Sequence, residues 1–250
     1  MARRVLLPLP DRDFDPTEAA VPWRELCDAG HQVVVATEAG AIPACDPRAL
    51  DGIVLGRFGA SAQARADYAE LERAPELRAP ARWADLEPER FDGLLLPGGH
   101  APGMRRYLGS PLLQEKVAAF WRLGRPVGAI CHGVLLLARA RDEDGRSLIA
   151  RRRTTCLPAY LERIARLGTF WLGDYARTYP TYVEDEVRGA LEDPARQLER
   201  GPLIVARGTA TRDRGAFVVV DGSYVSGRWL GDAYLFARTF RRLLEKGPAA

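Results

Sequence analysis

The stretch that decides the fold is Val127-Gly-Ala-Ile-Cys-His-Gly133, which is followed by the largely apolar segment 134–140. A short β-branched and small-residue run of this kind is typical of a buried strand, and the apolar segment after it is typical of a helix. Cys131 lies at the turn between the two, where Gly128, Ala129 and Gly133 permit a tight bend. The pattern is a nucleophile elbow with cysteine in place of serine.

Outward from this turn, strand and helix signals alternate along the chain. We expect strands at 4–9, 32–37, 91–97, 125–130, 203–206 and 217–220, and helices at 17–29, 62–74, 110–123, 159–167, 183–191 and 230–244. Asp221-Gly222 is a hairpin turn signal that leads into Tyr224-Val225. The alternation predicts one α/β domain over 1–250, with an insertion or cap at about 38–90. Its doubly wound, mostly parallel sheet is flanked by helices, with the nucleophile elbow and a C-terminal hairpin.

Composition excludes several classes of function. The 36 basic residues nearly balance the 33 acidic ones in 250 residues, which leaves a net charge of +3 and favours no nucleic-acid partner. The only lysines, Lys116 and Lys246, do not follow a glycine-rich loop, so a P-loop is excluded. The longest apolar stretch is too short to span a bilayer, so no membrane association is expected. Four cysteines without CxxC spacing predict reduced thiols and a cytoplasmic location.

The position of Cys131 suggests chemistry. A side chain at the tip of such a turn is expected to be exposed above the sheet, at the N-terminus of a helix. The unpaired amides and the helix dipole there favour a thiolate, which predicts a lowered thiol pKa. The alternative is a small buried residue at a packing junction. Because parallel strands carry their ligands beyond their carboxyl ends, the Gly98-Gly99-His100 loop is expected to lie close to Cys131.

Four stretches together resemble the ThiJ/PfpI superfamily, which shares the class I glutamine amidotransferase-like fold. They are Phe91-Asp-Gly-Leu-Leu-Leu-Pro-Gly-Gly-His100, Ala129-Ile-Cys-His-Gly133, Glu18 in the first strand-to-helix loop, and Val218-Val-Val-Asp-Gly-Ser-Tyr-Val-Ser-Gly227. The chain length, the 38–90 insertion and Val183-Glu-Asp-Glu-Val187 are similar to the larger glyoxalase III and heat-shock chaperone branch. Members of the superfamily are described as glyoxalases, deglycases, chaperones, peptidases or hydratases, and are commonly homodimers.

The resemblance implies a role for each matching residue. Cys131 corresponds to the nucleophile, His132 to the adjacent general acid/base, and Glu18 to a buried carboxyl that contacts the thiol. The amides of Gly99 and His132 would form the oxyanion hole. His100 is expected to line the pocket, and Arg228 and Asp232 to shape it, whereas Trp229 is equally a candidate for the core or a dimer contact.

One position departs from the glyoxalase pattern. In that branch an acidic residue after the cysteine orients the histidine, and in the matching stretch 154–162 the expected position is not acidic. Glu162 is the only acid in the stretch. Glu184, Asp185 or a residue from a partner subunit are the alternatives, so the orienting group stays open at this point.

The histidines exclude two further classes. The chain has three, and none follows His132, so the downstream histidine of a glutaminase is missing. The absence of HExxH or similar spacing predicts no metal site.

Three hypotheses for function remain. The first is a cofactor-independent enzyme that acts on small reactive carbonyls, of the glyoxalase III or deglycase type, through a Cys131 thiolate. The second is hydrolysis of an amide, peptide or nitrile-type bond by the same nucleophile. The third is a chaperone or oxidative-stress sensor without turnover, in which Cys131 is oxidised.

Overall fold

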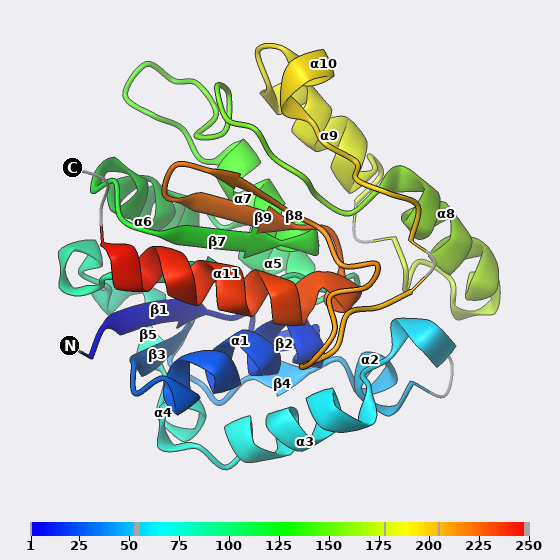
Figure 1. Cartoon of the computed structure of the whole chain (residues 1–250), viewed down its shortest axis with the longest axis horizontal. Coiled ribbons are helices and arrows are strands. Elements are labelled where there is room, and N and C mark those ends of the chain that lie inside the picture. Colours follow the sequence, from blue (N-terminus) through cyan, green and yellow to red (C-terminus); the bar gives the residue numbers. More distant parts are fainter. Residues whose placement is uncertain (1, 53–55, 178, 205, 248–250) are drawn as a thin grey trace.

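A seven-stranded sheet forms the centre of the protein (Figure 1). The computed structural model describes residues 2–52, 56–177, 179–204 and 206–247. In spatial order the strands are β5 (Ala81–Arg82), β3 (Gln32–Thr37), β1 (Arg4–Pro8), β6 (Gly93–Leu96), β7 (Val127–Ile130), β9 (Tyr224–Gly227) and β8 (Val218–Asp221). All neighbours pair in parallel except β8 and β9, which form an antiparallel hairpin. The predicted doubly wound α/β class and the C-terminal hairpin are therefore confirmed.

Helices cover both faces of this sheet (Figure 1). One face carries α1 (Pro16–Asp28) and α11 (Ala233–Lys246) side by side, with α3 (Ala62–Leu71) packed against α1. The other face carries α5 (Met104–Gly109), α6 (Pro111–Arg122) and α7 (Val134–Arg139). The remaining helices are α2 (Pro47–Asp51), α4 (Pro75–Arg78), α8 (Ala159–Gly168), α9 (Val183–Ala190) and α10 (Pro194–Gln197).

Short elements complete the chain. Strands β2 (Arg12–Phe14) and β4 (Ala44–Cys45) pair with each other in a separate small sheet. The single-turn 3-10 helices are η1 (Gly56–Phe58), η2 (Trp83–Asp85), η3 (Pro88–Arg90), η4 (Cys131–Gly133), η5 (Phe170–Leu172) and η6 (Leu230–Asp232). Residues 38–90 thus hold β4, α2, α3, α4 and the edge strand β5. No helix in the described ranges is both long and apolar enough to cross a membrane.

The central strands are apolar because they are covered on both faces. Every residue of β6 and β7 is buried. Since β1, β6 and β7 are parallel, their carboxyl ends meet at one edge of the sheet. The loops that leave this edge carry Asp15, the Gly98-Gly99 pair and Cys131, so the topology brings three distant segments together.

Two helices begin at side-chain N-caps. Asp15 accepts hydrogen bonds from the amides of Thr17 and Glu18 at 2.8 and 3.1 Å, and Pro16 occupies the first turn of α1. Ser110 accepts one from the amide of Leu113 at 3.2 Å at the start of α6. The first of these caps matters for the site, because it fixes the helix turn that carries Glu18.

The predicted strand at 203–206 is wrong for the described part of that segment. Leu203, Ile204 and Ala206 are irregular, and Val205 lies outside the described residues. The amide of Ile204 donates to the Tyr160 hydroxyl at 3.0 Å instead of to a neighbouring strand. The closing helix is shorter at its start than predicted, because Leu230–Asp232 form the 3-10 turn η6 before α11 begins.

The packing of Gly133 generates a prediction for stability. A Cβ at this position would lie 2.1 Å from the Leu96 carbonyl oxygen and 2.8 Å from that of Pro97, and both are backbone atoms. We expect Gly133→Ala to lower the free energy of unfolding by about 1–3 kcal/mol in urea denaturation, as overpacking does.

Gly189 in α9 provides the matched control. A Cβ there would meet nothing within 4 Å. Because alanine is the better helix former, Gly189→Ala should raise the free energy of unfolding by about 0.5–1 kcal/mol. Equal stability of Gly133→Ala and the unchanged protein would contradict the close approach of the two backbone segments.

Candidate functional site

Cys131 occupies a strained turn between β7 and α7. Its φ angle is +58°, in the left-handed region that residues other than glycine seldom adopt, and η4 then leads directly into α7. Gly133 allows the turn to approach the carbonyl of Leu96 at the end of β6. Strain of this kind persists only when the surrounding structure imposes it. The geometry is that of the nucleophile elbow expected from the sequence.

Glu18 reaches the same place from the first turn of α1. Its Oε2 accepts a hydrogen bond from the amide of Gly98 at 2.9 Å, and its carboxyl lies within hydrogen-bonding reach of the Cys131 thiol. The side chain is only 2% exposed. Burial, with the charge of Asp15 second, raises the pKa of Glu18 well above its usual range. A protonated Glu18 can donate a hydrogen bond to the sulfur, which an ionised carboxylate cannot do.

His132 and Glu162 extend this arrangement on the other side of the sulfur. Nδ1 of His132 lies 3.5 Å from Sγ of Cys131, and its Nε2 lies 4.0 Å from Oε1 of Glu162. Burial lowers the pKa of His132 to about 3 and raises that of Glu162 to about 8. Glu162 is held in place by the amide of Val183, which donates to its Oε2 at 2.8 Å. Of the candidate orienting acids, Glu162 is the one that the structure places at the histidine.

Glu184, another candidate for the orienting acid, has different partners. Its carboxylate accepts a hydrogen bond from the amide of Ala159 at 3.0 Å and pairs with Arg188 and Arg200. These contacts tie the start of α8 to α9. Glu184 therefore supports the helix that carries Glu162 and does not itself contact His132.

The expectation of an exposed thiol with a lowered pKa is wrong. Cys131 is 6% exposed, and burial raises the pKa of its thiol well above the ordinary value. The negative charges of Glu18 and Asp15 act in the same direction, and the hydrogen bond from the backbone amide of His132 opposes them with a smaller effect. Side chains from remote segments close over the turn, and their contribution outweighs the helix terminus. The resting thiol is thus protonated at neutral pH.

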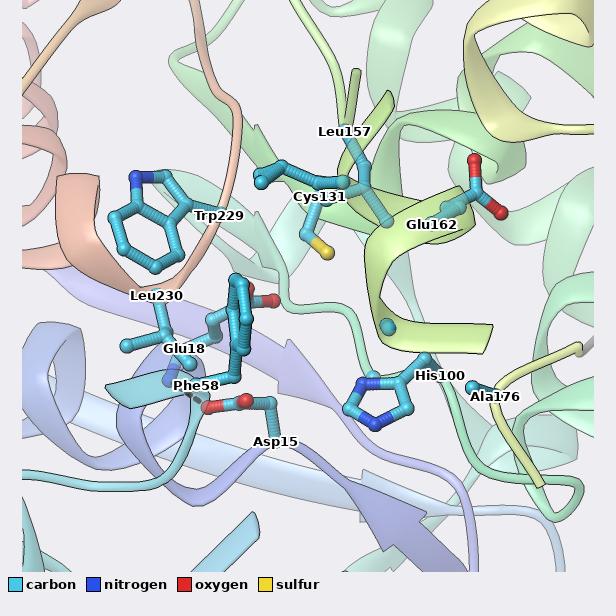
Figure 2. Close-up of a pocket in the computed structure, with 13 residues that line it drawn as sticks. Asp15, Glu18, Phe58, His100, Cys131, Leu157, Glu162, Ala176, Trp229 and Leu230 are labelled. Carbon is cyan, nitrogen blue, oxygen red and sulfur yellow. Dashed lines mark hydrogen bonds between the residues drawn. The ribbon is translucent and has the colours of Figure 1, made fainter. Parts of the chain in front are cut away.

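The sulfur nevertheless faces a small pocket, with a cavity volume of about 50 Å³. Figure 2 shows Cys131 pointing into it, with Glu18, Asp15 and His100 on one side and Leu157 on the other. The polar lining consists of Asp15, Glu18, Gly99, His100, Cys131 and Glu162. Apolar side chains complete the wall, among them Phe58, Leu157, Leu161, Trp229 and Leu230. Five of the predicted residues (Glu18, Gly99, His100, Cys131 and Glu162) therefore line one pocket, with His132 directly behind the sulfur.

Arg228 and Asp232, which were expected to shape the pocket, do not themselves line it. The two side chains are fully buried and form a bidentate ion pair, with Nε–Oδ2 2.9 Å and Nη2–Oδ1 3.0 Å. Arg228 also donates to the carbonyls of Pro202 and Gly215 at 2.7 and 3.0 Å. The pair anchors the long loop before β8 to η6, and it acts on the site only by placing Trp229 and Leu230 in the wall.

Asp15 is the site residue that sequence reasoning missed. It lines the pocket and is 4% exposed, and burial raises its pKa to about 7. The signal was present, because an aspartate before Pro16 and three residues before Glu18 is a helix N-cap at the expected edge of the sheet. Among the described residues, no group of three or more histidine, cysteine, aspartate or glutamate side chains is arranged to hold a metal ion.

Comparisons with known proteins agree with this architecture. Deglycase PfpI of Pyrococcus furiosus is 26% identical over 244 residues, covering 96% of this chain and 99% of the relative. The crystal structure of glyoxalase III from Candida albicans superposes with a TM-score of 0.69 at 18% identity, covering 96% and 97% of the two chains. That of the Francisella tularensis rapid encystment protein gives a TM-score of 0.72 at 17% identity, covering 97% and 99%. A model of the ThiJ/PfpI family-like proteins matches residues 9–202, and the chain belongs to this family.

Proposed function

We propose that this protein is a cysteine-dependent, cofactor-independent enzyme that acts on small reactive carbonyl compounds, in the manner of a glyoxalase III or a deglycase. The observation that carries the proposal is the contact geometry of one sulfur. Cys131 sits on a strained turn and faces a small pocket, between Nδ1 of His132 at 3.5 Å and the Glu18 carboxyl. A relative matched over nearly its whole length is named a deglycase, which supports this class of reaction.

The first step follows from the protonation states of the site. Because the resting thiol carries its proton, attack on an aldehyde carbon requires a base, and Nδ1 of His132 is positioned to accept that proton. The carbonyl oxygen becomes the hydroxyl of a hemithioacetal. Protonated Glu18 donates to the sulfur as negative charge develops there, and the amides of Gly99 and His132 are the proposed donors to the oxygen.

The second step converts the adduct into product. For methylglyoxal, the proton on the former aldehyde carbon moves through His132 to the neighbouring carbon. The hydroxyl proton of the hemithioacetal moves to the former ketone oxygen, so the adduct becomes the thioester of lactic acid. Water then cleaves the carbon–sulfur bond, lactate leaves, and the thiol regains its proton. One molecule of methylglyoxal and one of water give one of lactic acid, so no oxidant or cofactor is consumed.

Glu162 is proposed to orient His132 in both steps. The Glu162 carboxylate lies 4.0 Å from Nε2 of His132, on the side where Nε2 carries its proton. From there it can stabilise the imidazolium that forms when Nδ1 takes a proton from the sulfur. The low pKa of buried His132 makes this support necessary, because an isolated imidazole at this position is a weak base.

The observations at Cys131 bear on only one of the other hypotheses, oxidative sensing. Oxidative sensing calls for an accessible thiol of low pKa, and the burial and raised pKa of Cys131 weigh against it. Amide or nitrile hydrolysis and chaperoning stay predictions. The homodimer is supported by the family resemblance, and a reducing, cytoplasmic setting by the four unpaired cysteines.

Removing the sulfur is the first test. Cys131→Ser should lower lactate production from methylglyoxal on the order of 10³-fold or more, because a serine hydroxyl at this position lacks both the acidity and the nucleophilicity of the thiol. The measurement is enzymatic assay of D-lactate. Cys27→Ser on α1, which does not line the pocket, serves as the matched control and should keep the activity. Equal turnover by the Cys131→Ser protein would refute the proposal.

The pH profile tests the role of Glu162. Its pKa of about 8 means that the carboxyl is protonated below pH 8 and becomes a carboxylate above it. Because the carboxylate is the form that supports His132, Glu162→Gln should reduce kcat/KM much more at pH 9 than at pH 6, by roughly tenfold or more at the higher pH. The glutamine oxygen can still accept the hydrogen bond from Val183.

Glu115→Gln, an exposed position on α6, is the control for a change of one charge. It should leave the profile unchanged. A loss in Glu162→Gln that is the same at both pH values would show that the side chain acts only through packing.

A further inference from the structure

The pocket has an unusual distribution of charge. Three carboxyl groups line it, those of Asp15, Glu18 and Glu162. Within the described part of the chain, none of its lining residues is a lysine or an arginine. The rest of the wall is largely apolar, with Phe58 and Trp229 as its largest side chains. Sites that bind carboxylates or phosphates commonly present arginine or lysine side chains to the anion, and the charged side chains of this wall are carboxyl groups instead.

Asp15 has a pKa of about 7, so its charge changes near neutral pH, as that of Glu162 does near pH 8. Its Oδ1 is held by the amides of Thr17 and Glu18, so the carboxyl has a defined position on the wall. Burial raises its pKa to about 7, the two amides lower it, Asp46 raises it and Arg207 lowers it. The charged groups around it are therefore Glu18 on its own helix, Asp46 before α2, and Arg207, whose guanidinium also donates to the Gly59 carbonyl at 3.0 Å.

An anion and a neutral molecule meet this wall differently. A carboxylate that enters must lose its water and then lie beside further carboxyl groups in a medium of low polarity, where repulsion between like charges is strong. The anion could bind only if Asp15 and Glu162 took up protons, since Glu18 already holds its own. A neutral carbonyl compound pays neither cost, and a short apolar substituent on it gains contact with Phe58, Leu161 or Trp229.

We infer that the Cys131 pocket selects uncharged carbonyl compounds with a short apolar substituent and rejects carboxylate- and phosphate-bearing ones, with Asp15 as the specificity-determining residue. The inference rests on the proposed function for the reaction, and it adds the chemical class of the substrate. Methyl- or other alkyl-substituted oxoaldehydes belong to the accepted class. Oxoaldehydes that carry an acid group belong to the rejected one.

Alkylation of Cys131 tests this selection without turnover. Iodoacetamide and iodoacetate carry the same reactive carbon and have nearly the same size, but only the second is an anion. The rate of modification of Cys131 by each is followed by peptide mass spectrometry at pH 8, and the ratio of the two rates is divided by the same ratio for glutathione. We expect iodoacetamide to be favoured at Cys131 by at least about tenfold beyond the free thiol, the effect of one nearby charge at low polarity.

Asp15→Asn identifies the residue responsible. Asparagine caps a helix as well as aspartate does, so α1 keeps its first turn. In this variant the ratio of the iodoacetamide rate to the iodoacetate rate at Cys131 should come several-fold closer to the ratio for glutathione. Asp28→Asn, the same substitution at the far end of α1, should leave the ratio at Cys131 unchanged. In the unsubstituted protein the preference for iodoacetamide should become smaller between pH 8 and pH 6, because Asp15, with a pKa of about 7, and Glu162, with a pKa of about 8, both take up protons in this range. The part of this change that remains in Glu162→Gln belongs to Asp15, so the pH dependence tests the inference even where the Asp15 variant does not fold.

Two results would overturn the inference. One is a ratio at Cys131 equal to that of glutathione at pH 8, which means that the pocket does not sense charge. The other is a ratio at pH 8 that is the same in Asp15→Asn and in the unsubstituted protein, which means that Asp15 does not determine the selection. Failure of the proposed function would appear separately, as methylglyoxal that is not converted to lactate although Cys131 discriminates between the two reagents.

Discussion

The close packing of the turn at Cys131 against the end of β6 is the constraint on which the site depends. Gly133 lies so near the Leu96 carbonyl that no side chain fits there, and a Cβ on Gly98 would lie 2.7 Å from the amide of His132 and 2.8 Å from Oε2 of Glu18. These contacts force Cys131 into a positive φ angle and aim its sulfur into the pocket. The same contacts bring the first turn of α1 within reach of that sulfur. Strain in the turn is offset by the buried sheet on either side.

Burial has a second consequence, which is electrostatic. Carboxyl groups and a thiol that share a small apolar enclosure disfavour one another's ionisation, and burial adds to this effect. Glu18 and the Cys131 thiol are therefore uncharged at rest, whereas Asp15 ionises near neutral pH. The proposed chemistry depends on moving one proton between Cys131, His132 and the substrate, and not on a stored thiolate. On this proposal, the burial of Cys131 and the carboxyl groups around it keep oxidants and anions from the sulfur and admit an uncharged electrophile.

Much of the fold, and the position of several site residues, could be predicted from local sequence signals. The strand, turn and helix around Cys131, the caps of α1 and α6 and the hairpin before α11 each depend on residues close together in the chain. Parallel pairing then placed Glu18, Gly99 and Cys131 at one edge. The burial of Cys131 could not be predicted this way, because Leu157, Leu161 and Trp229 close over it from remote segments. The indirect role of Arg228 and Asp232 could not be predicted for a related reason, since a buried ion pair between the residues before η6 and η6 itself looks like a pair of pocket residues in sequence. The run 203–206 has the composition of a strand, but its described residues Leu203, Ile204 and Ala206 pair with none of the described strands.

The central claim is that Cys131 forms a covalent bond to the substrate during turnover. The most direct test of this claim is to let the protein turn over methylglyoxal, quench the reaction rapidly in the steady state, and analyse the peptides by mass spectrometry. The account predicts that the peptide containing Cys131 gains the mass of one methylglyoxal, that the adduct appears before lactate, and that it decays as the substrate is exhausted. Lactate formation without any adduct on Cys131, or with adducts confined to arginine side chains, would contradict the account.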